Sequence, residues 1–574
     1  MRLRELKIKN FRKLDDLTVT FPKGLCVIVG ENNTGKTAVI DALRLMLVPS
    51  RDLDALRITE DDFRSGTDGA PIEISCTFSD TSDAEEAHCQ ECLVDIGGGK
   101  FEIRLNARVE FNPETRRANV KMWGGETEGG SLPSDLYDRF ATIYLQPLRD
   151  PESGLRPGRH SQISRLVDCL TENDQQAQFV AIAQKANDEI KVLEPVTGAR
   201  KEINDQMSKI AGEQLTQDTD LVFSDPNFYR IISGLQPLIA GLPFTLNGLG
   251  YNNLIFTSAT LGTLRKSSQF AFRCILIEEP EAHLHPHLQL LLLAHLAAEA
   301  DSQTDPVQII TSSHSPILAS QAPIDSIVAI HGTTSKTSAI SMATIKIAEK
   351  QKDAEKLKKK LQRFLDATRA ELFFARRVLM VEGIAEALVL PVLATLVGGS
   401  LKKSAVTVVN ADGINFNAFL PIFGPGKLAV PIAILTDGDA ATVDGEPSDT
   451  AKGLKAQEAE NPTLRVEYCA VTFEHELARS PKLLDLMLDA FELLHPTTCK
   501  ALRTSIALLG TADEKAAASY KQFKDSETSK GSFAQELSVL LEAAELSQAD
   551  VPEYIRRALQ FLGVIQSGES LETR

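Results

Sequence analysis

The sequence lacks an apolar run long enough to cross a membrane. Its most apolar stretch, around Leu290–Ala298, is interrupted by His295 and falls short of the about 20 residues that a transmembrane helix needs. The opening MRLRELKIKN alternates charged and apolar residues and has no apolar core. We therefore expect neither a signal peptide nor a membrane protein.

Cysteine is also scarce, with eight residues scattered through 574. This usage suits reduced thiols, so we expect a cytoplasmic location. Cys89 and Cys92 form the one CxxC pair, with His88 beside it. Because a structural zinc site usually needs four ligands, this pair supplies at most half of one, and two ordinary thiols are the simpler interpretation.

Positive charge is in the minority. Lys and Arg number 61 against 78 Asp and Glu, which gives a formal net charge of −17. Such a chain is soluble and does not bind nucleic acid indiscriminately, although a local basic groove is still compatible with it. At about 100–200 residues per domain, the length predicts two or three domains.

A strand, a glycine-rich loop and a helix are predicted near the N-terminus. Leu25–Val29 is apolar, and apolar residues repeat at helical spacing from Val39 to Leu47. Between them GENNTGKT fits the phosphate-binding pattern GxxxxGK[ST], in which Lys36 reaches the β and γ phosphates of ATP and the Thr37 hydroxyl binds Mg²⁺. The predicted ATP ligands in this loop are Gly30, Glu31, Asn32, Asn33, Thr34, Gly35, Lys36 and Thr37.

A second apolar strand, Cys274–Ile277, runs into Glu278 and Glu279 in CILIEEPEAHLHP. One carboxylate at a strand end can hold the Mg²⁺ shell, and the next can orient or deprotonate the attacking water. We assign these roles to Glu278 and Glu279. The segment resembles the Walker B strand of ABC-type ATPases, with Glu278 where Asp is commoner.

Other segments resemble further parts of ABC-type heads. NGLGYNN, with Asn247, Gly248 and Gly250, resembles a loose signature loop; IITSSHSP supplies a switch histidine, His314; and YLQPLRD supplies a Q-loop glutamine, Gln146. In ABC-type heads the signature loop of one copy closes the site of the other. The resemblance therefore implies a homodimer or a higher oligomer.

The opening LKIKNFRKL and the loop that follows it resemble SMC-like and RecF-like heads, which act on DNA. The alternating histidines at 283, 285 and 287 allow a zinc interpretation, but Pro286 interrupts them and a loop explains the segment.

The fold expected from these patterns is α/β: an ABC/SMC-like P-loop ATPase head with a helical insertion, followed by a C-terminal α/β domain. A charged helix over Lys346–Arg369, with a basic run from Lys356 to Arg363, is expected to link them. The expected parts are an ATPase N-terminal lobe (1–150), a helical insertion for dimerisation (151–240), an ATPase C-terminal lobe (241–345), a linker helix (346–371) and the C-terminal domain (372–574).

Carboxylates also follow strands in the C-terminal part. VLMVEGIAE puts Glu382 at a strand end with Glu386 one helical turn later, and AILTDGD puts Asp437 and Asp439 at the end of another buried strand. Parallel sheets gather such ends at one edge, where converging carboxylates favour Mg²⁺ or Mn²⁺. The pattern resembles the Toprim fold of topoisomerases, primases and some nucleases. A carboxylate-rich turn or a calcium loop is the alternative for DGDAATVDGE, which lacks EF-hand spacing.

An ABC-type head followed by a Toprim domain resembles the OLD (overcoming lysogenization defect) family of ATP-dependent nucleases, which includes Gabija-type effectors. By that resemblance Glu474 and Glu476 in TFEHEL complete a second metal site, and Lys530 in KGSFAQEL stabilises charge on the phosphate. The resemblance implies ATP with one metal ion, two Mg²⁺ or Mn²⁺ ions at the Toprim site, DNA as the substrate, and a helicase among the partners it allows.

The predicted function is a divalent-metal-dependent DNA endonuclease that binds and hydrolyses ATP and acts in phage defence or DNA processing. The alternative is an SMC/RecF-like, ATP-driven DNA repair clamp without nuclease activity. A primase should carry a template-binding module such as a zinc ribbon, and none is visible. With only seven tyrosines, a covalent tyrosine mechanism is not favoured either.

Overall fold

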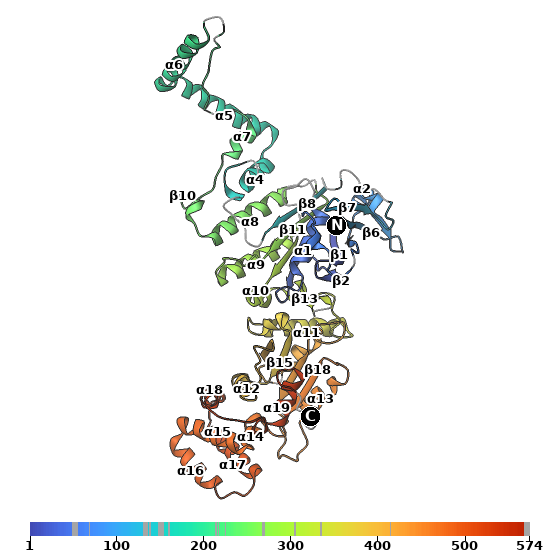
Figure 1. Cartoon of the computed structure of the whole chain (residues 1–574), viewed down its shortest axis with the longest axis vertical. Coiled ribbons are helices and arrows are strands. Elements are labelled where there is room, and N and C mark those ends of the chain that lie inside the picture. The colour runs from blue at the N-terminus through green and yellow to red at the C-terminus, as the bar shows by residue number, and fades with distance from the viewer. Residues whose placement is uncertain are drawn as a thin grey trace.

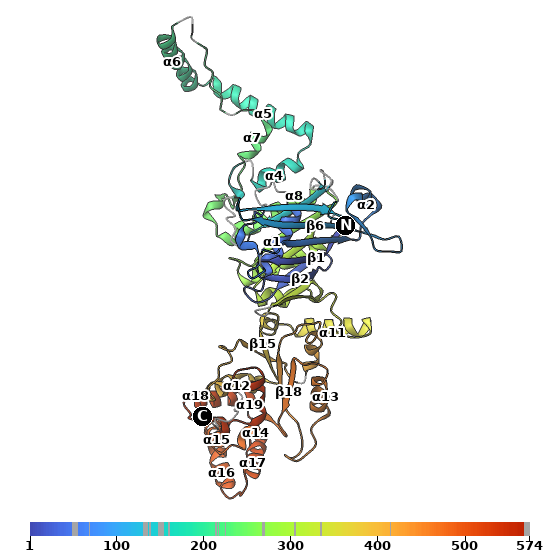
Figure 2. The same cartoon turned by 45° about the vertical axis from the view of Figure 1, so that its right-hand side comes forward.

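The computed structural model is elongated, with a helical arm at one end and an α/β domain at the other (Figure 1, Figure 2). It describes residues 1–566 except 49–55, 68, 130–131, 133–135, 137–138, 147–153, 159–160, 213–214, 216, 224, 267–269, 303–305, 333–335 and 414. The expected domain boundary at residues 150/151 lies outside the described residues.

An antiparallel sheet forms much of the N-terminal lobe, in the order β2-β1-β4-β6-β5 with β7 paired to β6. Its inward side chains, such as Leu6 and Ile8, form one buried core with helix α1 (Lys36–Leu47). The short helix α2 (Asp83–His88) lies at its edge. The strands are β1 (Arg2–Phe11), β2 (Leu14–Thr20), β4 (Ile72–Ser79), β5 (Leu93–Asp95), β6 (Phe101–Asn112) and β7 (Arg117–Gly124).

The central sheet of the ATPase head has the order β14-β13-β3-β12-β11-β8. Only the β13–β14 pair is antiparallel. Residues in β3 and β12 are all buried, as expected for parallel strands covered on both faces. The strands are β3 (Leu25–Val29), β8 (Phe140–Leu145), β11 (Phe272–Glu278), β12 (Gln308–Ser313), β13 (Ile327–Gly332) and β14 (Thr337–Ser341), and the helices that follow β11 and β12 are α9 (Pro286–Ala300) and α10 (Pro316–Gln321).

A helical arm projects from the head between β8 and β11 (Figure 1). Helix α8 packs on α4 at its base, and α5 packs on α7 further out. The arm has helices α4 to α7 within residues 151–240, where the sequence predicted a helical insertion, whereas α8 lies in the predicted ATPase C-terminal lobe. The helices of the arm are α4 (Gln162–Leu170), α5 (Asn173–Lys191), α6 (Glu194–Ala211), α7 (Phe228–Ser233) and α8 (Leu249–Lys266), with a small hairpin of β9 (Leu238–Ile239) and β10 (Leu242–Pro243).

The linker helix is shorter than the charge pattern predicted. Helix α11 spans Gln351–Phe364, and a short 3₁₀ helix over Arg369–Phe374 follows it. Ile347 is buried in the ATPase core, so residues before Gln351 pack as an extended segment instead of entering the helix. The same buried core continues through Leu361 and Phe373 into the C-terminal sheet, which joins the two domains.

The C-terminal domain has a parallel sheet in the order β16-β15-β17-β18. Helices α12 and α18 pack together beside it, and a second core fills the space between sheet and helices. The strands are β15 (Arg377–Val381), β16 (Val406–Asn410), β17 (Ile432–Thr436) and β18 (Leu464–Tyr468). The helices are α12 (Ile384–Leu396), α13 (Asp449–Glu458), α14 (Phe473–Ala478), α15 (Pro481–Leu494), α16 (Pro496–Ile506), α17 (Ala512–Asp525), α18 (Lys530–Glu542) and α19 (Glu553–Phe561).

Candidate functional sites

The glycine-rich loop lies between β3 and α1, as the sequence predicts. Gly30 has φ 152° and Gly35 has φ 105°, values that other residues rarely adopt. A Cβ atom on Gly30 would lie 2.2 Å from the carbonyl oxygen of Ile330, and one on Gly35 would lie 2.7 Å from Leu14. The backbone angle therefore favours glycine at both positions, and at Gly30 the Ile330 backbone also leaves no space for a Cβ atom.

Lys36 closes this loop on itself. Its Nζ donates to the carbonyl oxygens of Gly30 and Glu31 at 2.6 and 2.7 Å. Burial lowers the pKa of Lys36 to about 8, against the opposing effect of Glu279, Glu31 and Glu281. A buried ammonium that, among the described residues, donates only to backbone carbonyl oxygens is well placed to donate to phosphate oxygens instead.

Glu278 ends β11 beside the start of α1. The Tyr144 hydroxyl donates to it at 2.8 Å, and Thr37 also bonds to it. Burial raises the pKa of Glu278. The guanidinium of Arg44 stacks 3.8 Å from the ring centre of Tyr144, which fixes the tyrosine. Tyr144 was not predicted, because its role depends on β8 lying beside β11.

Glu279 and His314 face each other across the ends of β11 and β12. The Nε2 of His314 lies 3.5 Å from Oε1 of Glu279. Glu279 has φ 45°, a strained value for this residue, and its N–H donates to Ser312. Burial lowers the pKa of His314, and Lys36 lowers it further. The pair predicted to orient water and to sense the γ-phosphate is thus brought together.

Glu281 is a third carboxylate at this edge, and the sequence analysis missed it. It accepts hydrogen bonds from the Ser313 hydroxyl at 2.8 Å and from the His314 N–H at 2.9 Å. Burial raises its pKa. Glu281 therefore positions the histidine. The signal was present in EEPEAH as a third acidic residue, but only the pairing of β11 with β12 gives it a partner.

The predicted signature residues lie around the start of α8. Asn247 and Gly248 come just before or at its first turn, and Gly250 lies so close to the next loop that a Cβ would be 2.7 Å from the His283 carbonyl oxygen. Gln146 follows directly on β8 and is exposed. The structure thus places Gln146 next to the strand that ends in Glu278.

A second group of carboxylates lies at the carboxyl edge of the C-terminal sheet. Glu382 follows β15 and accepts hydrogen bonds from the Thr436 hydroxyl at 2.9 Å and from the Asp437 N–H at 3.2 Å. Asp437 follows β17, is 9% exposed, and accepts from the Phe473 N–H at 2.8 Å. The adjacent parallel strands β15 and β17 bring these two acids together, as predicted.

Two helix N-termini complete this carboxylate cluster, which we define as Glu382, Glu386, Asp437 and Glu474. Glu386 lies in the first turn of α12 and Glu474 in the first turn of α14, and both are buried. Lys530, the first residue of α18, lies 3.2 Å from Glu474. The other oxygen of Glu474, Oε2, is buried and has no hydrogen-bond partner.

Burial and, after it, repulsion between neighbouring carboxylates disfavour the ionised acids of the cluster. Burial raises the pKa of Asp437 to about 8, with Glu382, Glu386 and Glu474 adding to the effect and Lys530 opposing it. Burial likewise raises the pKa of Glu386 to about 7. The pKa of Lys530 is raised, because Glu474, Asp437 and Glu386 outweigh its burial. The cluster therefore offers several carboxylate oxygens with only one nearby cation among the described residues. Hard divalent cations such as Mg²⁺ and Mn²⁺ prefer such oxygen ligands.

Two predicted metal ligands stand apart from the cluster. The Asp439 side chain is exposed, with the backbone at φ 52°, and Glu476 pairs with Arg479 at 3.0 Å. Among the described residues, no three His, Cys, Asp or Glu side chains already lie in ligating positions. One oxygen of Glu382 accepts from the Thr436 hydroxyl, and Glu474 pairs with Lys530.

One ion pair connects the two sites and was not predicted. Arg376, just before β15, donates through Nε to Glu31 of the glycine-rich loop at 2.6 Å. The strand that begins after Arg376 ends at Val381, and Glu382 follows it directly. A single five-residue strand therefore separates the ATPase loop contact from the carboxylate cluster.

Comparison with known protein families finds a match in the N-terminal part of the chain and another in the C-terminal part. The AAA ATPase domain matches residues 1–91 and 160–319, and the "Overcoming lysogenization defect protein-like, TOPRIM domain" matches residues 373–439. The glycine-rich loop, Glu278, Glu279 and His314 fall inside the first match. Glu382, Glu386, Asp437 and Asp439 fall inside the second, whereas Glu474, Glu476 and Lys530 lie beyond it. No helix in the described part of the chain is long and apolar enough to span a bilayer.

Individual relatives cover most of the chain. An OLD nuclease of Thermus scotoductus is 25% identical over 488 residues, which is 82% of this chain and 88% of that protein. An endonuclease GajA of Bacillus cereus is 21% identical over 461 residues, 78% of this chain and 76% of that protein. Among solved structures, the C-terminal region of the Burkholderia pseudomallei OLD protein covers 33% of this chain and 97% of that chain, at 23% identity and a TM-score of 0.27.

Proposed function

We propose that this chain, which joins an AAA ATPase domain to an OLD-like Toprim domain and is homologous to an OLD nuclease and to the endonuclease GajA, hydrolyses ATP and cuts DNA with the help of divalent metal ions. Phage defence or DNA processing in the cytoplasm is the setting we propose. The resemblance to Gabija-type effectors adds a helicase as a candidate partner.

The observation that carries the nuclease proposal is the carboxylate cluster. Three buried acids, Glu386, Asp437 and Glu474, lie with the half-buried Glu382 beside a lysine. They come from two strand ends and two helix N-termini, and among the described residues one buried oxygen of Glu474 has no partner. Such an arrangement costs folding free energy, because burial and like charges both disfavour the ionised carboxylates. A repair clamp without nuclease activity would have no use for it.

The donor set fits Mg²⁺ or Mn²⁺, and we propose two ions at this site and one with ATP. Bound there, such ions polarise a phosphodiester and lower the pKa of a water molecule. The residues that would hold them are Glu382, Glu386, Asp437 and Glu474, with Asp439 and Glu476 as further ligands that must turn inward. Lys530, at the rim, would pair with the phosphate as negative charge develops on it.

The ATPase site has its own division of roles. Lys36 would exchange the Gly30 and Glu31 carbonyl oxygens for phosphate oxygens, and Thr37 with Glu278 would hold the metal ion of ATP. Glu279 lies where it can accept a proton from water, and His314 holds its carboxylate at 3.5 Å.

We also propose that the ATPase works as a homodimer. The signature segment of each copy would then reach the ATP of the other. Gly248 is exposed, and a Cβ atom there would meet no atom within 4 Å, so a second copy has room to approach it. The helical arm supplies the contact surface, because large apolar side chains there are exposed in the single chain. Ile182, Val192, Ile210, Leu215 and Phe223 are between 71% and 83% exposed.

The proposal is tested by DNA cleavage with Mg²⁺ or Mn²⁺, with and without ATP, on supercoiled and linear DNA. We expect Asp437→Asn to abolish cutting and to leave ATP turnover intact. Asp444→Asn, an exposed acid in the same loop after β17, is the matched control and should cut like the wild type. We expect Lys36→Ala to lose ATP turnover. Cutting by Asp437→Asn at the wild-type rate would refute the assignment of the nuclease site.

A further inference from the structure

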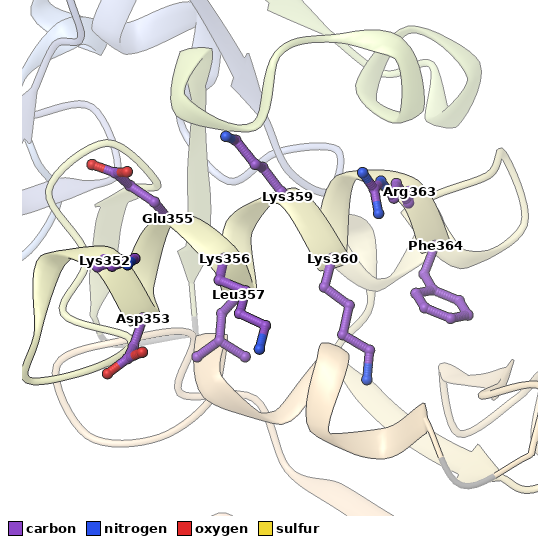
Figure 3. A pocket seen from close by; sticks show the side chains of 9 residues that line it. All are labelled: Lys352, Asp353, Glu355, Lys356, Leu357, Lys359, Lys360, Arg363 and Phe364. Carbon is purple, nitrogen blue, oxygen red and sulfur yellow. The ribbon is translucent and has the colours of Figure 1, made fainter.

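Helix α11 carries a stripe of cations between the ATPase head and the C-terminal sheet. Lys352, Lys356, Lys359 and Arg363 are all exposed. At about 100° per residue, they fall within an arc of about 60° on one face of the helix. Figure 3 shows these side chains spreading from the helix, with Lys360 beside them. We call these five residues the α11 stripe.

The stripe has no acidic partners within the described part of the chain. Of the six cations on α11, Lys358 is the one that forms an ion pair there, with Asp325. Lys360 lies over the ring of Phe364 at 5.8 Å, and the acids Asp353 and Glu355 flank the stripe without pairing to it. The chain as a whole has a net charge of −17, but this face of α11 is locally positive because its cations form no ion pairs with other described residues.

The opposite face of α11 is fixed to the ATPase head. Leu361 is buried, and the Gln362 side chain accepts from the Ile324 N–H at 2.6 Å and donates to the Ser320 carbonyl oxygen at 3.4 Å. These contacts anchor the helix on the ATPase head, and its cations line an open surface that belongs to α11 alone. Because the helix backbone is already anchored, binding a ligand to its charged face costs little additional conformational entropy.

The helix also runs close to the carboxylate cluster. Phe364 packs against Phe419 at 6.3 Å, and α11 contacts the short 3₁₀ helix Asn415–Ala418. The loop before that helix donates the Gly413 N–H to the carbonyl oxygen of Glu382 at 2.7 Å. The stripe and the proposed cleavage site are therefore linked through one short loop.

From these observations we propose that the α11 stripe binds the phosphate backbone of duplex DNA and holds it beside the cleavage site. This inference rests on the proposed nuclease function. From Lys352 to Arg363 the stripe is about 16 Å long, which matches about five base pairs of duplex. Lysine and arginine side chains that contact only phosphates do not distinguish one base from another. We therefore expect the stripe to bind DNA independently of its sequence.

The experiment measures binding of the full chain to a fluorescent duplex in EDTA, across a series of salt concentrations. The test variant is Lys352→Glu with Lys356→Glu and Lys359→Glu. The control carries the same charge change at exposed lysines of α16 and α17: Lys500→Glu, Lys521→Glu and Lys524→Glu.

We expect the stripe variant to bind DNA at least about tenfold more weakly and to lower the slope of log K against log salt by about 2.7 in magnitude. ATP turnover should match the wild type, which reports that the protein is folded. The control variant should bind within about twofold of the wild type.

The outcomes separate the stripe from the nuclease. If the stripe variant binds and cuts DNA as the control does, with the same salt slope, the inference is overturned while the nuclease function stands. If the wild type binds DNA through the stripe but cuts it under no condition, the stripe stands and the nuclease function falls.

Discussion

Replacing Asp437 by Asn should stabilise the metal-free C-terminal domain, and increasingly so as the pH rises. Burial, aided by Glu382, raises the pKa of Asp437 from 3.8 to about 8. Between these values the folded protein binds a proton that the unfolded chain has released. The free energy of unfolding therefore falls as the pH rises, by about 1.4 kcal/mol per pH unit.

The expected magnitude follows directly. Between about pH 5.5 and 7.5, Asp437 by itself costs the metal-free wild type about 3 kcal/mol of stability, and Asn at this position removes that cost. Below about pH 4 Asp437 is protonated in both the folded and the unfolded chain, so the free energy of unfolding carries no penalty from this residue. The penalty grows as the pH rises and is complete near pH 8, where the folded chain also loses the proton. Asp444→Asn should show no such change, because Asp444 is exposed.

The assay has to report on the C-terminal domain itself. The single tryptophan, Trp123, lies in β7 of the N-terminal lobe, so tryptophan fluorescence reports the wrong domain. Hydrogen exchange of peptides covering β17 in EDTA, compared between wild type and variant at each pH, gives the difference locally. Parallel pH profiles for the two proteins would refute a buried, mutually repelling cluster. Added Mn²⁺ should stabilise the wild type and have much less effect on the variant.

Three further predictions concern the ATPase. Glu279→Gln should keep ATP binding and lower ATP turnover by about 10²–10⁴-fold, measured by phosphate release; turnover near the wild-type rate would exclude Glu279 as the base. Gly30→Ala should abolish ATP binding, because its Cβ would lie 2.2 Å from the Ile330 carbonyl oxygen, and isothermal titration would detect any retained affinity. Ile182→Asp with Ile210→Asp should give monomers in light scattering and lose ATP turnover; a dimer in that variant would move the interface away from the arm.

The ATPase centre was largely predictable because its information is local. The strand, loop and helix from Leu25 to Leu47 are contiguous in sequence. Gly30 and Gly35 lie within the same segment, so the pattern that predicts the loop also includes them. Glu278 and Glu279 follow the same rule at the end of β11. Partners from other strands were not predictable: Tyr144 meets Glu278 across 134 residues of sequence, and Glu281 needs Ser313 of β12.

The charged linker shows a limit of periodicity. The pattern predicted one helix over Lys346–Arg369, but burial of Ile347 at one end and the turn after Phe364 at the other restrict it to Gln351–Phe364. Strands β13 and β14 pair with each other just before this segment and extend the ATPase sheet. Such ends are decided by what the flanking residues pack against, which the local pattern does not contain.

By itself the sequence determined which acids follow strands, because a carboxylate after a buried apolar run is a local feature: Glu382 and Asp437 are both of this kind. Only the tertiary structure decided which acids meet. Lys530 at the start of α18 meets Glu474 at the start of α14, whereas Asp439 is exposed and Glu476 pairs with Arg479. The sequence offered all of these residues as candidates. Side-chain direction at a helix start depends on the helix against which it packs, and that neighbour comes from a distant part of the chain.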